Sequence, residues 1–309
     1  MDLKDSFDLV IDASENAIKH SKDFFSYLRE PYSNAENVLI KALNEKGHVD
    51  SNDIEIAAAN LMVKKWVKKI KNHNSIIDKV NLQFEQVLAS ASSKEGRVNL
   101  RRPDEDWLEY FFDLSSRISN EAVQQIWANI LLKEHLNPGE ISKVMLNTLA
   151  LLDSNSANCF YKLCQLSYKL LIGDELRNIP LIIYENDIKK DLLRNENIST
   201  MFDEYLEFCP NENELELLSE IGLVTLSPHS REYYIYYPED GNATFSCNNF
   251  SKTIKGNFDH EDNVYMVQTG YIFFSQVGLA LYNIIGGREY DNLDKILNLF
   301  INSQNSESE

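Results

Sequence analysis

The stretch from residue 103 to residue 171 constrains the fold of this chain more than any other part of the sequence. It is the densest apolar region, it follows a helical period, and it holds two of the three tryptophans, Trp107 and Trp127. Apolar residues recur at spacings of three and four from Ala122 to Leu131, which is typical of a helix with one buried face. We therefore predict that helices packed around a shared core form the centre of the protein.

Local capping signals divide this stretch into four helices. Each helical run is preceded by a residue whose side-chain oxygen can accept a hydrogen bond from the first turn: Asp104, Ser119, Ser142 and Asp153. Asn137-Pro138-Gly139 forms a break, and the last helix is expected to run on through Leu171. Because short connections favour antiparallel neighbours, residues 101–172 are predicted to form a central helical bundle.

Residues 1–100 are predicted to form an N-terminal helical region that includes a basic helix. Amphipathic spacing predicts helices over residues 3–28 and 34–43, and a third over the run IEIAAANLMVKKWVKKIK. One face of that third helix carries Lys64, Lys65, Lys68, Lys69 and Lys71. Such a face can bind nucleic acid, an acidic partner or a membrane surface. It can equally be a solvated face above an ordinary core stripe, which is the commoner case, so both interpretations stay open.

Residues 173–303 are predicted to form an acidic α+β domain, followed by a disordered tail at 304–309. From Ile172 to the end of the chain there are 24 Asp or Glu against nine Lys or Arg. Short β-branched or aromatic runs predict strands at 179–184, 223–226, 233–237 and 264–274, the last of them interrupted by Gly270. Helical runs at 187–195, 199–208, 213–221, 275–285 and 293–301 separate them, and Gly222 is expected to end the run at 213–221. This order is similar to a winged-helix-like arrangement, so the predicted fold is mostly α with a smaller α+β part.

Composition excludes several broad classes of protein. With 43% hydrophobic residues but few Gly and Pro, the chain can bury a core and is neither collagen-like nor rich in linkers. The net charge of −18 disfavours binding to nucleic acid by the protein as a whole. The four cysteines form no CxxC pair, so we expect reduced and mostly buried thiols. The first residues lack a signal-peptide pattern and no long apolar run occurs, so a cytoplasmic protein without a membrane span is expected.

One series of short motifs resembles a known family. In order, these are Asp106-Trp107, Phe111-Phe112, Ile118-Ser-Asn-Glu121, Ile126-Trp-Ala-Asn-Ile-Leu131, Pro138-Gly139 and Ser142. The series resembles a bacterial family of unknown function that is similar to the abortive-infection alpha proteins. Members often carry Ala-Gly-Glu where this chain has Leu132-Lys133-Glu134, so the helix is expected to run longer here. The resemblance implies a role in antiviral defence or a stress response, and no established reaction.

Two clusters of charged residues are candidates for chemistry. Glu185, Asp187 and Lys189 follow an expected strand in the order that metal-dependent nucleases use, but no further acid on a neighbouring strand is identifiable. Asp259-His260-Glu261-Asp262 could bind a metal, although adjacent residues do not all converge on one ion, which favours a solvated loop. Phosphate-binding loops and nucleophile elbows are absent from the sequence. We therefore predict no catalytic residues, no cofactor and no metal site.

The sequence favours a non-enzymatic protein-interaction or regulatory protein that binds a protein partner or itself. Nucleic-acid binding through the face from Lys64 to Lys71 is the alternative, and a toxin-like effector with an unrecognised site is the second alternative. Residues 199–226 contain no Lys or Arg, which disfavours DNA contact by the winged-helix-like part.

Overall fold

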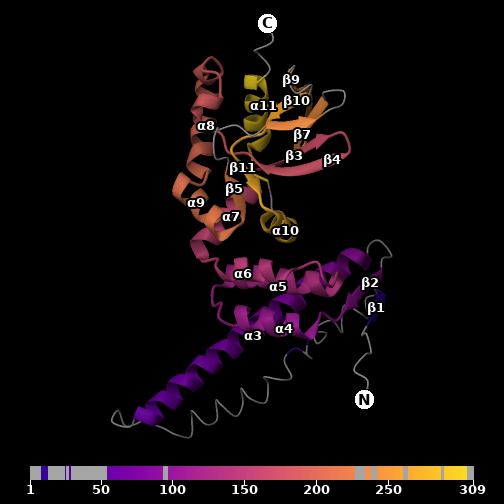
Figure 1. Cartoon of the computed structure of the whole chain (residues 1–309), viewed down its shortest axis with the longest axis vertical. Coiled ribbons are helices and arrows are strands. Elements are labelled where there is room, and N and C mark those ends of the chain that lie inside the picture. Colours follow the sequence, from indigo (N-terminus) through magenta and orange to yellow (C-terminus); the bar gives the residue numbers. More distant parts are fainter. Residues whose placement is uncertain are drawn as a thin grey trace. The chain divides into compact units, whose positions relative to one another are not determined.

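The fold was examined in a computed structural model of the whole chain (Figure 1). The structure describes residues 8–12, 25, 28, 54–92, 97–226, 234–237, 242–259, 264–286 and 289–304. It is mostly helical with a smaller sheet part, and it divides into two compact units, Met1–Ser154 and Asn155–Glu309. This division does not show which segments fold independently. The domain limits predicted from the sequence, at residues 100, 172 and 303, therefore stay predictions.

The first unit is built on one long helix. Helix α3 (Ile54–Ser92) has 39 residues and packs against α5 (Glu121–Leu136), while α4 (Glu105–Ser115) packs against α6 (Lys143–Ala150). Strands β1 (Asp8–Asp12) and β2 (Arg97–Arg101) form an antiparallel pair, with Val10 opposite Asn99. The predicted helix over residues 3–28 is therefore wrong at Asp8–Asp12, because pairing with a distant segment overrides the local helical spacing.

Local capping predictions for these helices hold with one change. Asp104 caps α4 by accepting a hydrogen bond from the Trp107 amide, and Ser142 caps α6 by accepting one from Met145. The cap of α5 is Asn120, which accepts from the Val123 amide, and not the neighbouring Ser119. Boundaries of this kind shift by one residue easily, because Ser and Asn are both good caps.

Aromatic side chains in mutual contact lie at the centre of this unit. Phe111 lies between the two tryptophans of α4 and α5, with ring centroids 5.2 Å from both Trp107 and Trp127. Trp107 is further held by a 2.8 Å hydrogen bond from its Nε1 to the carbonyl oxygen of Ile141. The core that the sequence places at these residues is therefore present.

The second unit begins with a helix that leads into a sheet. Helix α7 (Ser154–Gln165) is followed by β3 (Ser167–Ile172) and β4 (Glu175–Pro180). With β7 (Asn242–Cys247) and β8 (Phe250–Lys255) they form an antiparallel sheet of order β4-β3-β7-β8. Two predictions are wrong here. The last helix of the central stretch does not continue to Leu171, and the strand expected at 179–184 lies earlier, at Glu175–Pro180.

Helices and shorter strands complete the second unit. The helical part comprises the 3₁₀ turns η3 (Glu185–Asp187) and η4 (Leu192–Arg194), and helices α8 (Glu196–Phe208), α9 (Glu212–Ile221), α10 (Gln276–Ile285) and α11 (Leu293–Gln304). Strand β5 (Val224–Leu226) pairs with β11 (Ile272–Phe274), and β10 (Val264–Gln268) lies between β6 (Tyr234–Tyr237) and β9 (Asn257–Asp259). Gly222 ends α9 with a φ of 88°, as the sequence predicts.

Buried tyrosines join the sheet to the helices of this unit. The Tyr168 ring stacks on Phe245 across β3 and β7, and its hydroxyl donates to the Thr269 carbonyl at 2.9 Å. The Tyr205 hydroxyl of α8 donates to the Leu181 carbonyl and accepts from the Ile183 amide. Residues 181–183, which leave the ladder after β4, are thereby bound to a helix.

Candidate interaction surface

The candidate surface lies on α3, where a buried seam of side chains emerges into solvent. Trp66, Ile70, His73, Ile77, Val80 and Phe84 recur at alternating spacings of four and three, so they share one face of the helix. From Ile70 onward this seam is buried. Trp66 is 53% exposed, and Met62, one turn earlier on the same face, is 62% exposed. We call residues 61–71 the α3 tip.

The length of α3 explains why its seam is uncovered there. At about 1.5 Å per residue, a helix of 39 residues is more than twice as long as the 16-residue α5 that packs on it. Figure 1 shows the first half of α3 extending past α4 and α5. Large apolar side chains on an uncovered helix face are typical of a binding surface.

The tip also carries five lysines, most of which lie on the side of the helix away from the exposed apolar side chains. Lys64, Lys65, Lys68 and Lys71 are exposed, and Lys69 is half-buried with its Nζ 5.9 Å from the centroid of the Trp66 ring. Within the part of the chain that the structure describes, these five lysines form no ion pair. The tip thus carries the predicted basic face and, on its other side, an exposed tryptophan that Lys69 borders.

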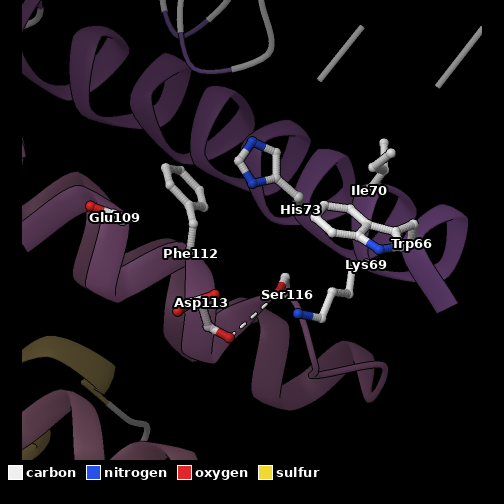
Figure 2. Close-up of a pocket in the computed structure, with 8 residues that line it drawn as sticks. All are labelled: Trp66, Lys69, Ile70, His73, Glu109, Phe112, Asp113 and Ser116. Atoms are coloured by element: carbon white, nitrogen blue, oxygen red, sulfur yellow. Dashed lines mark hydrogen bonds between the residues drawn. The ribbon is translucent and has the colours of Figure 1, made fainter. Parts of the chain in front are cut away.

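A hollow of about 150 Å³ separates the tip from α4 (Figure 2). It is lined from α3 by Trp66, Lys69, Ile70 and His73, and from α4 and its C-cap by Glu109, Phe112, Asp113 and Ser116. The ring centroids of His73 and Phe112 lie 4.0 Å apart, and the two rings form the apolar wall of the hollow. Glu109 and Asp113 contribute exposed carboxylates. The hollow can receive one side chain of a partner, with apolar contacts inside and charges of both signs outside.

Comparison with known proteins places the chain in a family. Residues 71–298 match a family model described as "Protein of unknown function (DUF2806)". The chain belongs to this family. No curated protein and no solved structure matches the chain.

The DUF2806 match covers only part of the candidate surface. It includes His73 and the four α4-side residues of the hollow, whereas Trp66, Lys69 and Ile70 precede it. Any function of the α3 tip is therefore inferred from its own side chains and not from the family match.

Of the predicted cluster Glu185, Asp187 and Lys189, Asp187 has a structural role in this DUF2806 chain. Asp187 accepts a 2.7 Å hydrogen bond from the Tyr184 amide and a 2.6 Å bond from the Tyr271 hydroxyl. Glu185 is exposed, and the Lys189 backbone amide donates to Ser303. In the described ranges, no group of three His, Cys, Asp or Glu is placed to hold a metal ion. Of the second cluster, His260, Glu261 and Asp262 lie outside the described residues.

Buried polar groups near the end of α5 also have structural partners. Glu134 accepts hydrogen bonds from the backbone amides of Gly139 at 2.6 Å and Ile141 at 3.0 Å, and burial raises the pKa of its carboxyl. Nδ1 of His135 lies 2.7 Å from the Leu131 carbonyl oxygen, and burial lowers the pKa of this imidazole to about 4. The burial of His135 was not predicted from the sequence. The signal was its position in the apolar period of α5.

The cysteines are unreactive in this fold. All four are free thiols, and Cys159, Cys164 and Cys247 are buried. Burial raises the pKa of Cys159, Cys209 and Cys247 to about 12, so almost no nucleophilic thiolate forms at neutral pH. Among the helices that the structure describes, none combines the length and apolar character needed to cross a membrane.

Proposed function

We propose that this chain is a non-enzymatic protein-interaction or regulatory protein of the cytoplasm that binds a protein through the α3 tip. The observation that carries the proposal is the half-exposed Trp66 on a seam that is buried from Ile70 onward. Tryptophan is enriched at the energetic centres of protein interfaces, because it buries a large apolar area with few rotatable bonds. A position on this seam that the described helices leave uncovered is best explained by a partner that covers it.

The chemistry around Trp66 favours a protein over a nucleic acid. The lysines of the tip, which form no ion pair with the described residues, support the nucleic-acid alternative. Met62 and Trp66, however, form an exposed apolar face on the same segment, and Glu109 and Asp113 present carboxylates beside that face, at the hollow. Phosphates would be repelled by those carboxylates, whereas a protein with apolar and acidic side chains can match the tip and the edge of the hollow.

We further propose that the second unit has a winged-helix-like arrangement that serves protein interaction. Helices α8 and α9 are separated by residues 209–211, and β5 follows α9 and pairs with β11. Helix α9 would then occupy the recognition position. It carries Glu212, Glu214, Glu216 and Glu220, and residues 199–226 contain no basic side chain. Because a DNA-reading helix needs positive charge, a protein ligand is the better match for this part.

The biological role that we propose is antiviral defence or a related stress response, on the strength of the abortive-infection resemblance. Phage challenge of host cells that carry the wild-type chain or a Trp66→Asp variant tests it. Protection that needs Trp66 supports the proposal. Growth arrest of uninfected cells by the wild-type chain would instead favour the toxin-like effector.

Site-specific crosslinking tests whether the tip binds a protein. A photoreactive amino acid is placed at residue 66 of the full chain in the native host, and at residue 82 as the control. Leu82 lies on the same helix and is 59% exposed, but it is outside the tip. We expect a discrete protein adduct from residue 66 and none from residue 82. Adducts only with nucleic acid, or equal adducts from both positions, would overturn the proposal.

A further inference from the structure

We infer that the protein partner of the α3 tip inserts an arginine side chain into the hollow between α3 and α4. The inference rests on the proposed function, and it deepens it by naming the chemistry that the hollow recognises. It follows from one cavity that combines an exposed tryptophan ring, an apolar wall and two carboxylates without ion-pair partners.

The hollow lies where the facing stripes of two helices do not close over each other. Each helix lines it at positions i, i+3, i+4 and i+7, which share one helix face, from Trp66 to His73 on α3 and from Glu109 to Ser116 on α4 and its C-cap. His73 and Phe112 are buried, whereas Trp66 and the carboxylates are exposed. The hollow is therefore apolar inside and polar at its rim (Figure 2).

The two carboxylates at this rim have no cation of their own. Glu109 and Asp113 are one helical turn apart on α4, so they lie on the same face. Neither forms an ion pair with the described residues. An apolar side chain that filled the hollow would displace water from them without replacing its hydrogen bonds, and an acidic side chain would be repelled. Charge complementarity therefore favours a cation as the occupant.

The chain already places one cation of its own at the hollow. The Nζ of Lys69 lies 5.9 Å from the centroid of the Trp66 ring, and Figure 2 shows this amino group pointing from α3 toward Ser116 and Asp113. Among the described residues Lys69 forms no ion pair. Its four-carbon stem is flexible, so the ammonium can turn out to solvent when another cation enters. Lys69 is therefore a competitor that the incoming group displaces.

Arginine matches this lining better than lysine does. Its guanidinium is planar, stacks on aromatic faces and can donate to two carboxylate oxygens at once. Trp66 offers an exposed ring for stacking, and Glu109 and Asp113 offer the acceptors. The apolar stem of arginine can pack against His73 and Phe112. A volume of about 150 Å³ is below that of small-molecule sites, so the expected occupant is a single side chain.

Titration of the full chain with short peptides tests the inference. The probe is a tripeptide of leucine, arginine and leucine, blocked at both ends, and the same peptide is made with citrulline, lysine or glutamate at the centre. Citrulline keeps the shape of arginine without its charge. Binding is followed by NMR through the indole N–H signal of Trp66, which is identified by its absence from a Trp66→Phe variant.

Three variants separate the roles of the charges. Glu109→Gln/Asp113→Asn removes both carboxylates of the hollow with little change of shape. Glu216→Gln/Glu220→Gln removes two carboxylates one turn apart on α9 and is the control for net charge. All four residues are exposed, so each variant should keep its fold. Lys69→Met removes the competing ammonium and keeps an apolar stem.

We expect the arginine peptide to shift the Trp66 signal in a saturable way, and the citrulline peptide to bind about fivefold more weakly or less still. Glu109→Gln/Asp113→Asn should weaken binding of the arginine peptide by about tenfold, because two charged acceptors are lost. The α9 control should leave this binding within about twofold of the wild type. Lys69→Met should strengthen it by about threefold, because a like charge is removed from the hollow.

Three outcomes would overturn the inference. These are an arginine peptide that leaves the Trp66 signal unchanged, a citrulline, lysine or glutamate peptide that binds as well as the arginine peptide, and equal binding by the carboxylate variant and the α9 control. Crosslinking from residue 66 tests the proposed function separately. A discrete protein adduct without arginine binding would remove this inference alone, whereas the absence of any protein adduct would remove both.

Discussion

Gly278 of α10 lies so close to Leu223 that a Cβ at residue 278 would be 1.8 Å from the Leu223 carbonyl oxygen. The contact is reinforced by Ser275, whose amide donates to the same carbonyl at 3.0 Å and whose hydroxyl donates to the Gly222 carbonyl at 2.6 Å. Helix α10 is thus held against the turn between α9 and β5 by backbone contact, which only glycine permits.

Gly278→Ala should therefore destabilise the second unit, although alanine is the better helix former. We expect a loss of about 3 kcal/mol or more in the free energy of unfolding, because the added methyl meets backbone that cannot move aside. Chemical denaturation measures the loss. Asn283→Ala, at an exposed position of the same helix, should change stability by less than about 0.5 kcal/mol. Equal stability of the two variants would contradict the contact.

Substitution of Asp187 and of Glu185 distinguishes a structural role of this cluster from a catalytic one. Asp187→Ala removes the acceptor of the Tyr184 amide and of the Tyr271 hydroxyl, so it should lower stability by about 1–2 kcal/mol. The exposed Glu185→Ala should lower it by less than about 0.5 kcal/mol. Thermal and denaturant unfolding measure both. A metal-dependent nuclease activity that either substitution abolishes would show that this interpretation is wrong.

The sequence predicts those parts of the fold that depend on neighbouring residues. The caps at Asp104 and Ser142, the glycine stop at Gly222 and the interruption at Gly270 are local signals, and each occurs in the structure. Strand β1 could not be predicted in this way, because its partner β2 lies far along the chain. Strand β3 continues the apolar pattern of α7, and its clearest signal, the two-residue hairpin loop Gly173-Asp174, was overlooked.

The same distinction holds for the candidate surface. Helical period alone predicts that Lys64, Lys65, Lys68, Lys69 and Lys71 lie on the face opposite the apolar stripe that includes Trp66. The hollow could not be predicted, because Phe112 and Asp113 reach it from another helix. Exposure of Trp66 was equally unpredictable, since it depends on how far the shorter helices extend along α3. Local patterns thus locate charge, whereas tertiary packing decides which apolar residues stay uncovered.

Trp107 and Trp127 form a matched pair for measuring one buried hydrogen bond. Both rings contact Phe111, but Nε1 of Trp107 donates to Ile141, whereas Nε1 of the buried Trp127 has no acceptor in the described part of the chain. Replacement by Phe removes a similar volume at both sites. Trp107→Phe should cost about 1 kcal/mol more stability than Trp127→Phe, because only the first breaks a hydrogen bond. Denaturant unfolding of both variants checks the difference, and a larger loss at Trp127 would contradict it.

His135 should make the stability of the first unit depend on pH below neutrality. Burial lowers the pKa of the folded imidazole from 6.5 to about 4. Above pH 6.5 the group is neutral in both states, so its contribution is fully present. As pH falls from 6.5 toward 4, the unfolded chain binds a proton that the folded chain does not, and stability should fall by up to about 3 kcal/mol.

The neighbouring Glu134 changes stability with pH in the opposite direction, so the effect of His135 must be measured against a control variant. Its folded pKa is raised by burial, so the folded chain binds a proton first and gains stability as pH falls through that value. The wild-type slope is therefore a sum, and the His135 share is the difference between the wild type and a His135→Gln variant. Between pH 6.5 and pH 4, the two stability curves should differ in slope by up to about one proton, or about 1.4 kcal/mol per pH unit. Parallel curves would mean that His135 binds its proton over the same pH range in the folded and unfolded chains. The 2.7 Å contact from Nδ1 to the Leu131 carbonyl oxygen is compatible with that protonated form.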